Sequence, residues 1–290
     1  MTADSSLKTW TRLGLGTLLV TSALAGCGQP AAPADETASE IAAEAPSAVP
    51  KAPAAIAGEG EAGFGGEGEG GEGEGGVSIA AAYTDPVVYN SALAVAAAHV
   101  IAARDAFAEG EKSAAAEMYA HPVSEVLFDM EPVFKAQGVA DFTALFTETS
   151  AAVFAGETEE QINARTDTIL GALQTAAAKA PDNGTSPAMI GAGVAADQIN
   201  RASDMYRASL ETEQYEPYLD GYGFYKAAEL AFSHVSEEVE AANPDAASAI
   251  RNALDTLAEA YPTALRPAEP TGDPAAVTVA ASEVLLALSE

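Results

Sequence analysis

The hydrophobic and polar positions of residues 77–290 follow a helical pattern throughout. Alanine is abundant, runs of β-branched residues are short, and glycine and proline recur at helix-length intervals. Apolar side chains return every three or four residues, as they do on one face of an amphipathic helix. Two such stripes are Phe142, Leu145, Phe146 and Phe154, and then Phe224, Ala228, Ala231 and Val235.

This pattern predicts an all-α fold, an up-and-down helical bundle of seven or eight helices that follows a disordered acidic linker. Thr158 and Asn243 are expected helix starts, because their side chains can cap free backbone N–H groups. A tetratricopeptide array is the competing architecture, but the repeat period of that fold does not recur. The predicted helices cover residues 85–109, 111–137 with an interruption at Pro122, 139–155, 157–180, 187–212, 218–242, 245–261 and 273–288.

Residues 27–76 offer almost no apolar side chains to bury. The first half of this segment is rich in alanine and proline, and the second half alternates glycine and glutamate. Ordering such a sequence would lose conformational entropy with no core in return, so we predict a disordered tether. A flexible coil of this length spans about 40 Å. Its glutamates are expected to act as a solvated spacer, with weak cation binding as the alternative.

Residues 1–26 have the layout of a secretory signal. Two basic residues precede an apolar stretch that is too short to span a bilayer. The stretch ends at Leu24-Ala25-Gly26-Cys27, which resembles the lipobox of bacterial lipoproteins. The resemblance implies that residues 1–26 are removed and that Cys27 carries a covalent lipid, a diacylglyceryl thioether and usually an N-acyl chain.

The lipoprotein resemblance also implies a location. In enterobacterial lipoproteins an aspartate after the lipidated cysteine retains the protein in the inner membrane, and Gly28 stands at that position here. We therefore expect a lipid anchor in the outer membrane that leaves residues 77–290 in the periplasm. An ordinary signal cleaved near Ala23 or Ala25, with Cys27 left as a free thiol, is the alternative. No other segment is expected to span a membrane.

The chain is strongly acidic, with a formal net charge of −30. Counted by segment, the charge is +1 in residues 1–26, −9 in residues 28–76 and −22 in residues 77–290. A domain of this charge lacks the basic surface that nucleic acids require, so nucleic-acid binding is excluded. Metal ions or a cationic protein partner are the electrostatically consistent choices.

Two of the three histidines stand in a suggestive arrangement. His99 lies 11 residues before Gly110, the expected turn between the first two helices, and His121 lies 11 residues after it. Residues equidistant from the turn of a helical hairpin lie level with each other, so the two imidazoles are expected to meet. Glu125 follows His121 by about one helical turn. Two imidazoles and a carboxylate at one point suit zinc or iron.

Pro122 complicates this arrangement. A proline directly after His121 biases that histidine away from helical geometry, so a new helix is expected to start at Pro122. Met118 offers a copper-binding variant of the same site, with ordinary core packing as its alternative. Each histidine has the alternative of being a hydrogen-bonded core residue, and for His234 that interpretation is preferred.

A second cluster gathers tyrosines and acids between Tyr206 and Tyr225. Two glycines within it let backbones approach closely. One interpretation is a helix start that lines a ligand site and supplies Asp220, Glu216 or phenol oxygens. The alternative is an aromatic plug where helices cross. We include Asp220 among the predicted metal ligands.

Part of this pattern resembles the imelysin-type proteins, which are exported helical-bundle proteins of bacteria, several of them tied to iron uptake. The motif of that family is His-x-x-Glu, whereas the spacing here is His121-x-x-x-Glu125. The resemblance implies a helical bundle over much of residues 85–288. It is carried by His99, by Tyr119-Ala120-His121-Pro122 with Glu125, and by Tyr218-Leu219-Asp220-Gly221-Tyr222-Gly223-Phe224.

These observations predict a membrane-anchored bacterial lipoprotein whose helical domain binds an iron-like or zinc ion for uptake, storage or sensing. The predicted metal ligands are His99, His121, Glu125 and Asp220. No enzyme activity is expected, because no His-Glu-x-x-His motif, phosphate loop or Ser-His-Asp order stands out. The alternative is a structural or adaptor lipoprotein that meets a cationic partner through its acidic surface, and a hydrolase ranks third.

Overall fold

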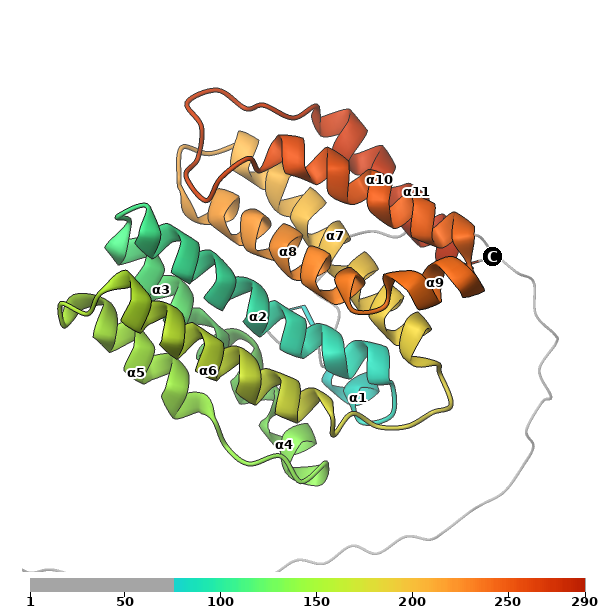
Figure 1. The fold of residues 1–290 in the computed structure, drawn as a ribbon, viewed down its shortest axis with the longest axis horizontal. Coiled ribbons are helices and arrows are strands. Elements are labelled where there is room, and N and C mark those ends of the chain that lie inside the picture. Colours follow the sequence, from blue (N-terminus) through green and yellow to red (C-terminus); the bar gives the residue numbers. More distant parts are fainter. Residues whose placement is uncertain (1–75, 290) are drawn as a thin grey trace, which may run out of the picture. The chain divides into compact units, whose positions relative to one another are not determined.

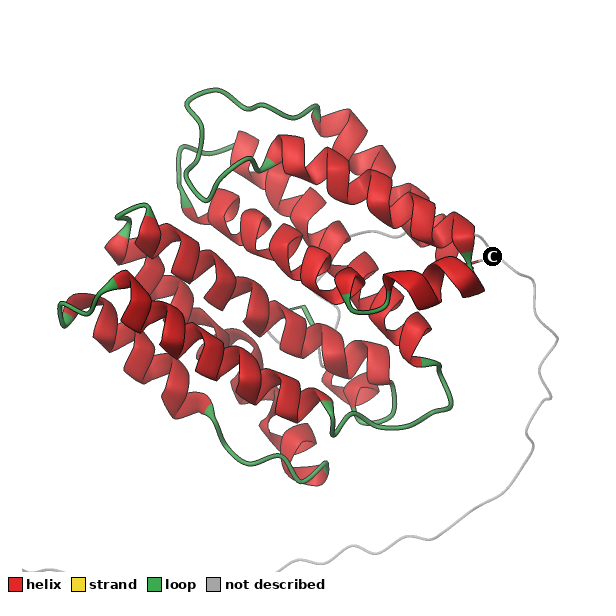
Figure 2. Cartoon of the chain, viewed as in Figure 1, coloured by secondary structure: helices red, strands yellow, loops and turns green. Residues whose placement is uncertain are grey.

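The computed structural model describes residues 76–289, and every regular element in this range is helical (Figure 1, Figure 2). The all-α prediction is therefore confirmed. The signal peptide, Cys27 and nearly all of the tether lie outside the described residues. The elements are α1 (Ile79–Ala82), α2 (Pro86–Ala108), α3 (Lys112–Pro122), the π-helical turn η1 (Val123–Leu127), α4 (Phe128–Ala136), α5 (Thr143–Phe154), α6 (Glu159–Ala177), α7 (Pro187–Leu210), α8 (Glu216–Ser233), α9 (Ser236–Ala242), α10 (Pro244–Ala260) and α11 (Pro274–Ser289).

The long helices of the described range form two four-helix bundles (Figure 1). Helices α2, α3, α5 and α6 pack against one another, and α7, α8, α10 and α11 do the same. The bundles meet along a seam where α2 packs against α8 and α7. The loop of residues 178–186 carries the chain from one bundle to the other. Side chains at the seam can therefore come from either bundle.

Local signals account for most helix ends. Thr158 Oγ1 accepts from the backbone N–H of Gln161, and the Gln161 side chain accepts in return from the N–H of Thr158. Asn243 Oδ1 accepts from the N–H of Ala246 at the start of α10. Gly110 takes φ +90° just after α2, a conformation that residues with a Cβ rarely adopt. The predicted starts and this predicted turn are confirmed.

The predicted helices differ from the observed ones in three main respects. Helix α1 is not among the predicted helices, because four residues are too few to show a period. The predicted helix 139–155 begins at Thr143, after an Asp141 side chain that accepts from the Thr143 N–H. The predicted helix 218–242 is two helices, since the chain turns at Val235, whose φ is −131°. No glycine or proline marks that turn, and the packing of α9 against α10 and α7 accompanies it.

One predicted apolar stripe is wrong at its end. Phe146 is fully buried, whereas Phe154, the last residue of α5, is 66% exposed. The period places both residues on the same side of the helix, but Phe154 is its last residue and is left uncovered. Burial near a helix end depends on the length of the neighbours as well as on periodicity.

Helix α2 corrects the expectation that nothing after the signal could span a membrane. Within the described residues, it alone is long and apolar enough to do so by length and composition. Its alanine, valine and isoleucine residues raise its hydropathy on every face. However, 72% of its most apolar window is buried inside the domain, as for the central helix of a helical core.

The approach of α8 to α2 is unusually close at one point. A Cβ placed on Gly223 would lie 2.5 Å from the carbonyl oxygen of Ala98 and 3.1 Å from the Cβ of Ala102. Only glycine on one helix and small residues on the other allow the two backbones to come this near. The residue after Ala98 is His99, so this contact sets how α8 meets the histidine.

Substituting Gly223 with alanine is expected to lower the free energy of unfolding by about 1–3 kcal/mol, because the added methyl overlaps the Ala98 carbonyl. Gly171→Ala on α6 is the matched control, since a Cβ there meets nothing within 4 Å. That change should be neutral or stabilise by up to about 1 kcal/mol. Urea unfolding followed by circular dichroism measures both, and indistinguishable midpoints for the two variants would contradict the close approach.

Candidate metal centre

His99 is held rigidly in the core of the seam. Only 4% of the residue is exposed. Its Nδ1 donates to the carbonyl oxygen of Val95 one turn earlier, at 2.8 Å, and its ring meets the edge of Phe224 on α8 with centroids 5.9 Å apart. With Nδ1 carrying the proton, Nε2 is free to face the other helices, which is the arrangement of a histidine metal ligand.

His121 lies level with His99, as the spacing around Gly110 predicted. The ring centroids are 6.0 Å apart at an interplanar angle of 71°. The expectation that Pro122 starts a new helix is wrong, because α3 continues through Pro122 and His121 is helical. The proline has no N–H to donate. The helix directly after it widens into the π-helical turn η1, in which the N–H of Phe128 donates to the carbonyl of Val123.

Glu125 lies in η1 and faces both histidines. Its Oε2 is 3.3 Å from His99 Nε2, and its Oε1 is 3.6 Å from His121 Nδ1. One potential ligand atom from each of the three residues can be chosen so that all lie within 4.8 Å of one another. Adjacent ligands around a tetrahedral ion with bonds of about 2.1 Å lie about 3.4 Å apart. Small side-chain movements would therefore suffice for a shared ion.

Asp220 reaches the same point from α8, in the other bundle. Its Oδ1 is 3.7 Å from His99 Nε2. That oxygen is buried and has no hydrogen-bond partner. A buried carboxylate oxygen without a donor is costly unless a cation or a proton neutralises it. All four residues predicted as ligands are thus brought together, three from the first bundle and one from the second.

Burial and the charges in this cluster shift the pKa values of its two carboxyl groups in opposite directions. The pKa of Asp220 is raised to about 6, because burial and the charges of Glu125 and Glu216 outweigh the opposing effect of His99. Contact with His99 lowers the pKa of Glu125 despite burial. Burial alone would lower the pKa of His99, but Glu125 and Asp220 together raise it. The cluster concentrates negative charge around one histidine nitrogen, an environment that suits a cation.

Glu216 was not among the predicted ligands, although the sequence placed it in the tyrosine-rich cluster. It precedes Asp220 by one turn of α8, and its Oε1 lies 3.9 Å from His121 Nδ1. Its side chain is 60% exposed, whereas the side chain of Asp220 is 17% exposed. The i, i+4 spacing of two acids at the start of α8 was the available signal.

The tyrosines of the second cluster have a structural role. The phenol hydroxyls of Tyr215 and Tyr218 donate to the carbonyls of Ala264 and Thr263, and Tyr206 donates to the carbonyl of Gly272. These bonds fasten the long loop between α10 and α11 onto α7 and α8. The aromatic-plug alternative therefore describes the tyrosines, while Asp220 alone of the predicted ligands in this cluster joins the histidines.

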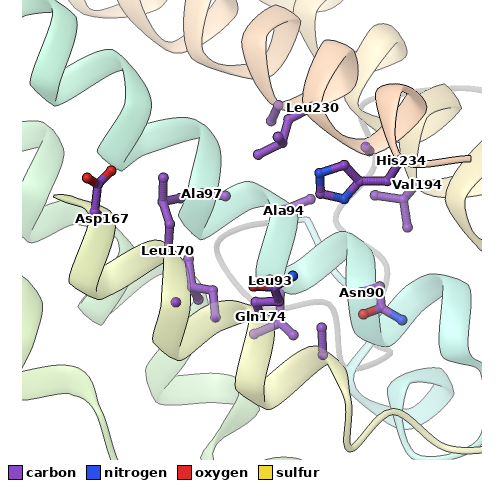
Figure 3. A pocket seen from close by; sticks show the side chains of 15 residues that line it. Asn90, Leu93, Ala94, Ala97, Asp167, Leu170, Gln174, Val194, Leu230 and His234 are labelled. Carbon is purple, nitrogen blue, oxygen red and sulfur yellow. The ribbon is translucent and has the colours of Figure 1, made fainter.

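His234 lies apart from the centre. It lines a mostly apolar groove of about 490 Å³, together with Asn90, Leu93 and Ala97 of α2 (Figure 3). With 3.6 residues per turn, those α2 residues lie on the face opposite His99. Among the described residues, only His99, His121 and Glu125 form a group of three or more such side chains with ligand atoms this close. His234 is therefore a natural control for the centre.

The methionine of the copper variant lies near the centre but in the core. Met118 is 2% exposed and lines a hollow of about 250 Å³ together with His121. Met130 is fully buried and Met205 packs against the core, as filler residues do. The centre is therefore described best by nitrogen and oxygen donors.

Residues 212–290 match the family described as an iron permease-associated 4-helix bundle domain. This stretch is well under half of the chain and contains α8, α9, α10 and α11. It includes Asp220 and Glu216 but neither His99 nor His121. No curated protein and no solved structure matches the chain. The match agrees with the coarser prediction of a helical bundle related to iron uptake.

The raised pKa of Asp220 has a consequence for stability. Its native pKa of about 6 exceeds the ordinary value of 3.8, so its contribution to stability is lost as pH rises through about 6. Asp220→Asn is expected to stabilise the chelator-treated protein by up to about 3 kcal/mol near pH 8 and by much less near pH 4, since each pKa unit is about 1.4 kcal/mol.

Urea unfolding of the wild type and Asp220→Asn across this pH range measures the effect. Asp167→Asn, which changes an exposed aspartate on α6, is the control and should show no such pH-dependent gain. A constant difference between Asp220→Asn and wild type at all pH values would contradict the burial of an ionised carboxylate.

Proposed function

We propose that this protein is a lipid-anchored bacterial envelope protein whose helical domain captures a metal ion, iron-like or zinc, for uptake. The ligands are His99, His121, Glu125 and Asp220. The observation that carries the proposal is the convergence of two imidazoles and a carboxylate within 4.8 Å. The similarity of residues 212–290 to an iron permease-associated bundle supports iron as the cargo.

The donor set fits a borderline or moderately hard cation. Imidazole nitrogens suit zinc and iron, and carboxylates add affinity for ferrous iron over softer ions. The unpartnered Oδ1 of Asp220 and the acids around His99 provide the charge that such an ion neutralises. The residues present therefore fit the proposed cargo.

The exposure of the ligands favours exchange over storage. His99 is buried, but the side chains of His121 and Glu125 are 25% and 33% exposed. One cluster of four ligands holds a single ion, which suits capture and transfer. A tether of about 40 Å between Cys27 and the domain would let the centre work away from the lipid surface.

His121→Ala is expected to lower metal affinity by at least about tenfold, because it removes a ligand and leaves the carboxylates unbalanced. His234→Ala is the matched control and should bind as the wild type does. The full chain, solubilised in detergent and stripped with a chelator, is titrated with Zn²⁺ and, under anoxic conditions, with Fe²⁺. Elemental analysis measures the stoichiometry of bound metal. Thermal shifts measure the stabilisation, which should be about 2.7 kcal/mol when the free metal concentration is one hundred times the dissociation constant.

Trace metal in all three proteins, with no thermal shift on adding either ion, would overturn the metal proposal. It would favour the alternative of an adaptor that meets a cationic partner through the −22 charge of residues 77–290. Equal metal affinity of His121→Ala and wild type would show that the metal binds at a site without His121.

The lipid anchor is tested separately through Cys27. Cys27→Ser is expected to move most of the exported protein from the membrane fraction to the soluble fraction, because no acyl chain can then attach. Ser47→Ala, a change in the tether, should leave fractionation unaltered. Retention of Cys27→Ser in washed membranes, with no change in the mass of the wild-type cysteine peptide, would rule the anchor out.

A further inference from the structure

A hollow of about 250 Å³ opens beside the metal centre, between α3 and the start of α8. His121 lies on its wall, so the hollow leads from the surface to one proposed ligand. Its other lining residues include Ala114, Glu117, Tyr215 and Glu216. The volume of the hollow and the charge of its walls determine which ions can reach the proposed metal centre through it.

The charged side chains that line the hollow are acidic. Glu117 of α3 and Glu216 of α8 are both exposed and face the space from its two sides. Two helices therefore contribute the same sign of charge to one opening.

No lysine or arginine is among the residues that line the hollow. Arg266, which lies in the loop between α10 and α11, donates to the backbone carbonyls of Gln214 and Ser209 and so holds the loop before α8. Tyr215 is fastened in the same way by its bond to the carbonyl of Ala264. The walls are thus braced by the loop between α10 and α11, while the acids remain on the open side.

The volume fits a hydrated ion. Six waters at about 30 Å³ each occupy about 180 Å³, so the hollow accommodates a divalent cation with its first hydration shell. A negatively charged chelate would be repelled by the same walls, and field lines focused into a recess make this discrimination stronger than on a flat surface.

Resting on the proposed function, we propose that this hollow is the route by which the centre takes up its metal, as a free hydrated divalent cation and not as an anionic chelate. Glu216 is the transfer residue. It faces the hollow and lies 3.9 Å from His121 Nδ1, so it can hold the incoming ion while hydration waters are exchanged for protein ligands. Glu117 completes the opposite wall and attracts the ion.

The test measures how fast the full-length protein binds Co²⁺, whose visible absorption changes when it gains protein ligands. Glu117→Gln combined with Glu216→Gln should slow association about tenfold at low salt, and high salt should remove most of the difference. Glu237→Gln combined with Glu238→Gln is the charge-matched control. These exposed acids lie beyond the far end of α8, a helix about 27 Å long, and their removal should change the rate less than about twofold.

Two further arms separate the route from the site. Ala114→Trp fills the hollow from its wall and should slow loading while the final amount of bound Co²⁺ equals that of wild type. Cobalt supplied as its anionic citrate complex should load wild type more slowly than the free ion does. The difference between these two loading rates should be smaller for the protein that carries both Glu117→Gln and Glu216→Gln.

Equal association rates in the two double-glutamine proteins, or wild-type loading as fast from citrate as from the free ion, would overturn the proposed route. Unchanged loading of Ala114→Trp would overturn it as well. Absence of Co²⁺ binding by wild type at any concentration is a different failure, since it contradicts the metal centre and not the route to it.

Discussion

The close contact between α2 and α8 is the constraint on which the seam depends. Gly223 leaves room for the Ala98 carbonyl, where a Cβ would lie 2.5 Å away. Because the backbones meet here, Phe224 packs against His99 and Asp220 comes within 3.7 Å of His99 Nε2. Alanines along α2 allow this approach, at the expense of the larger side chains that stabilise other helical cores.

The cluster that results is electrostatically strained. Asp220 is buried with an oxygen that no donor satisfies, and its pKa of about 6 follows from that burial. A fold selected for stability alone would place an apolar residue at the seam. At an ordinary core position, selection for stability removes a buried group of this kind. At a binding site it is kept because function needs it, and the cluster therefore supports a functional interpretation.

The centre is also a product of the two bundles together. His99, His121 and Glu125 come from the first, while Asp220 and Glu216 come from the helices that resemble the iron permease-associated bundle. The three side chains of the first bundle converge without help, and Asp220 adds a buried carboxylate from the second bundle. Movement of one bundle relative to the other would change the distance between Asp220 and His99, so the packing at the seam sets the geometry of the proposed centre.

The sequence by itself determined the helical class, most helix ends and the meeting of His99 with His121, because caps, glycine turns and equal spacing about Gly110 act over one or two turns. The sequence also suggested Asp220 as a ligand, but nothing in it indicated that α8 packs against α2. Only the tertiary structure decided that link, the π turn that carries Glu125, the exposure of Phe154 and the turn at Val235. In an alanine-rich chain every helix face is weakly apolar, so periodicity cannot say which faces meet, and the closest approach of two backbones decides it.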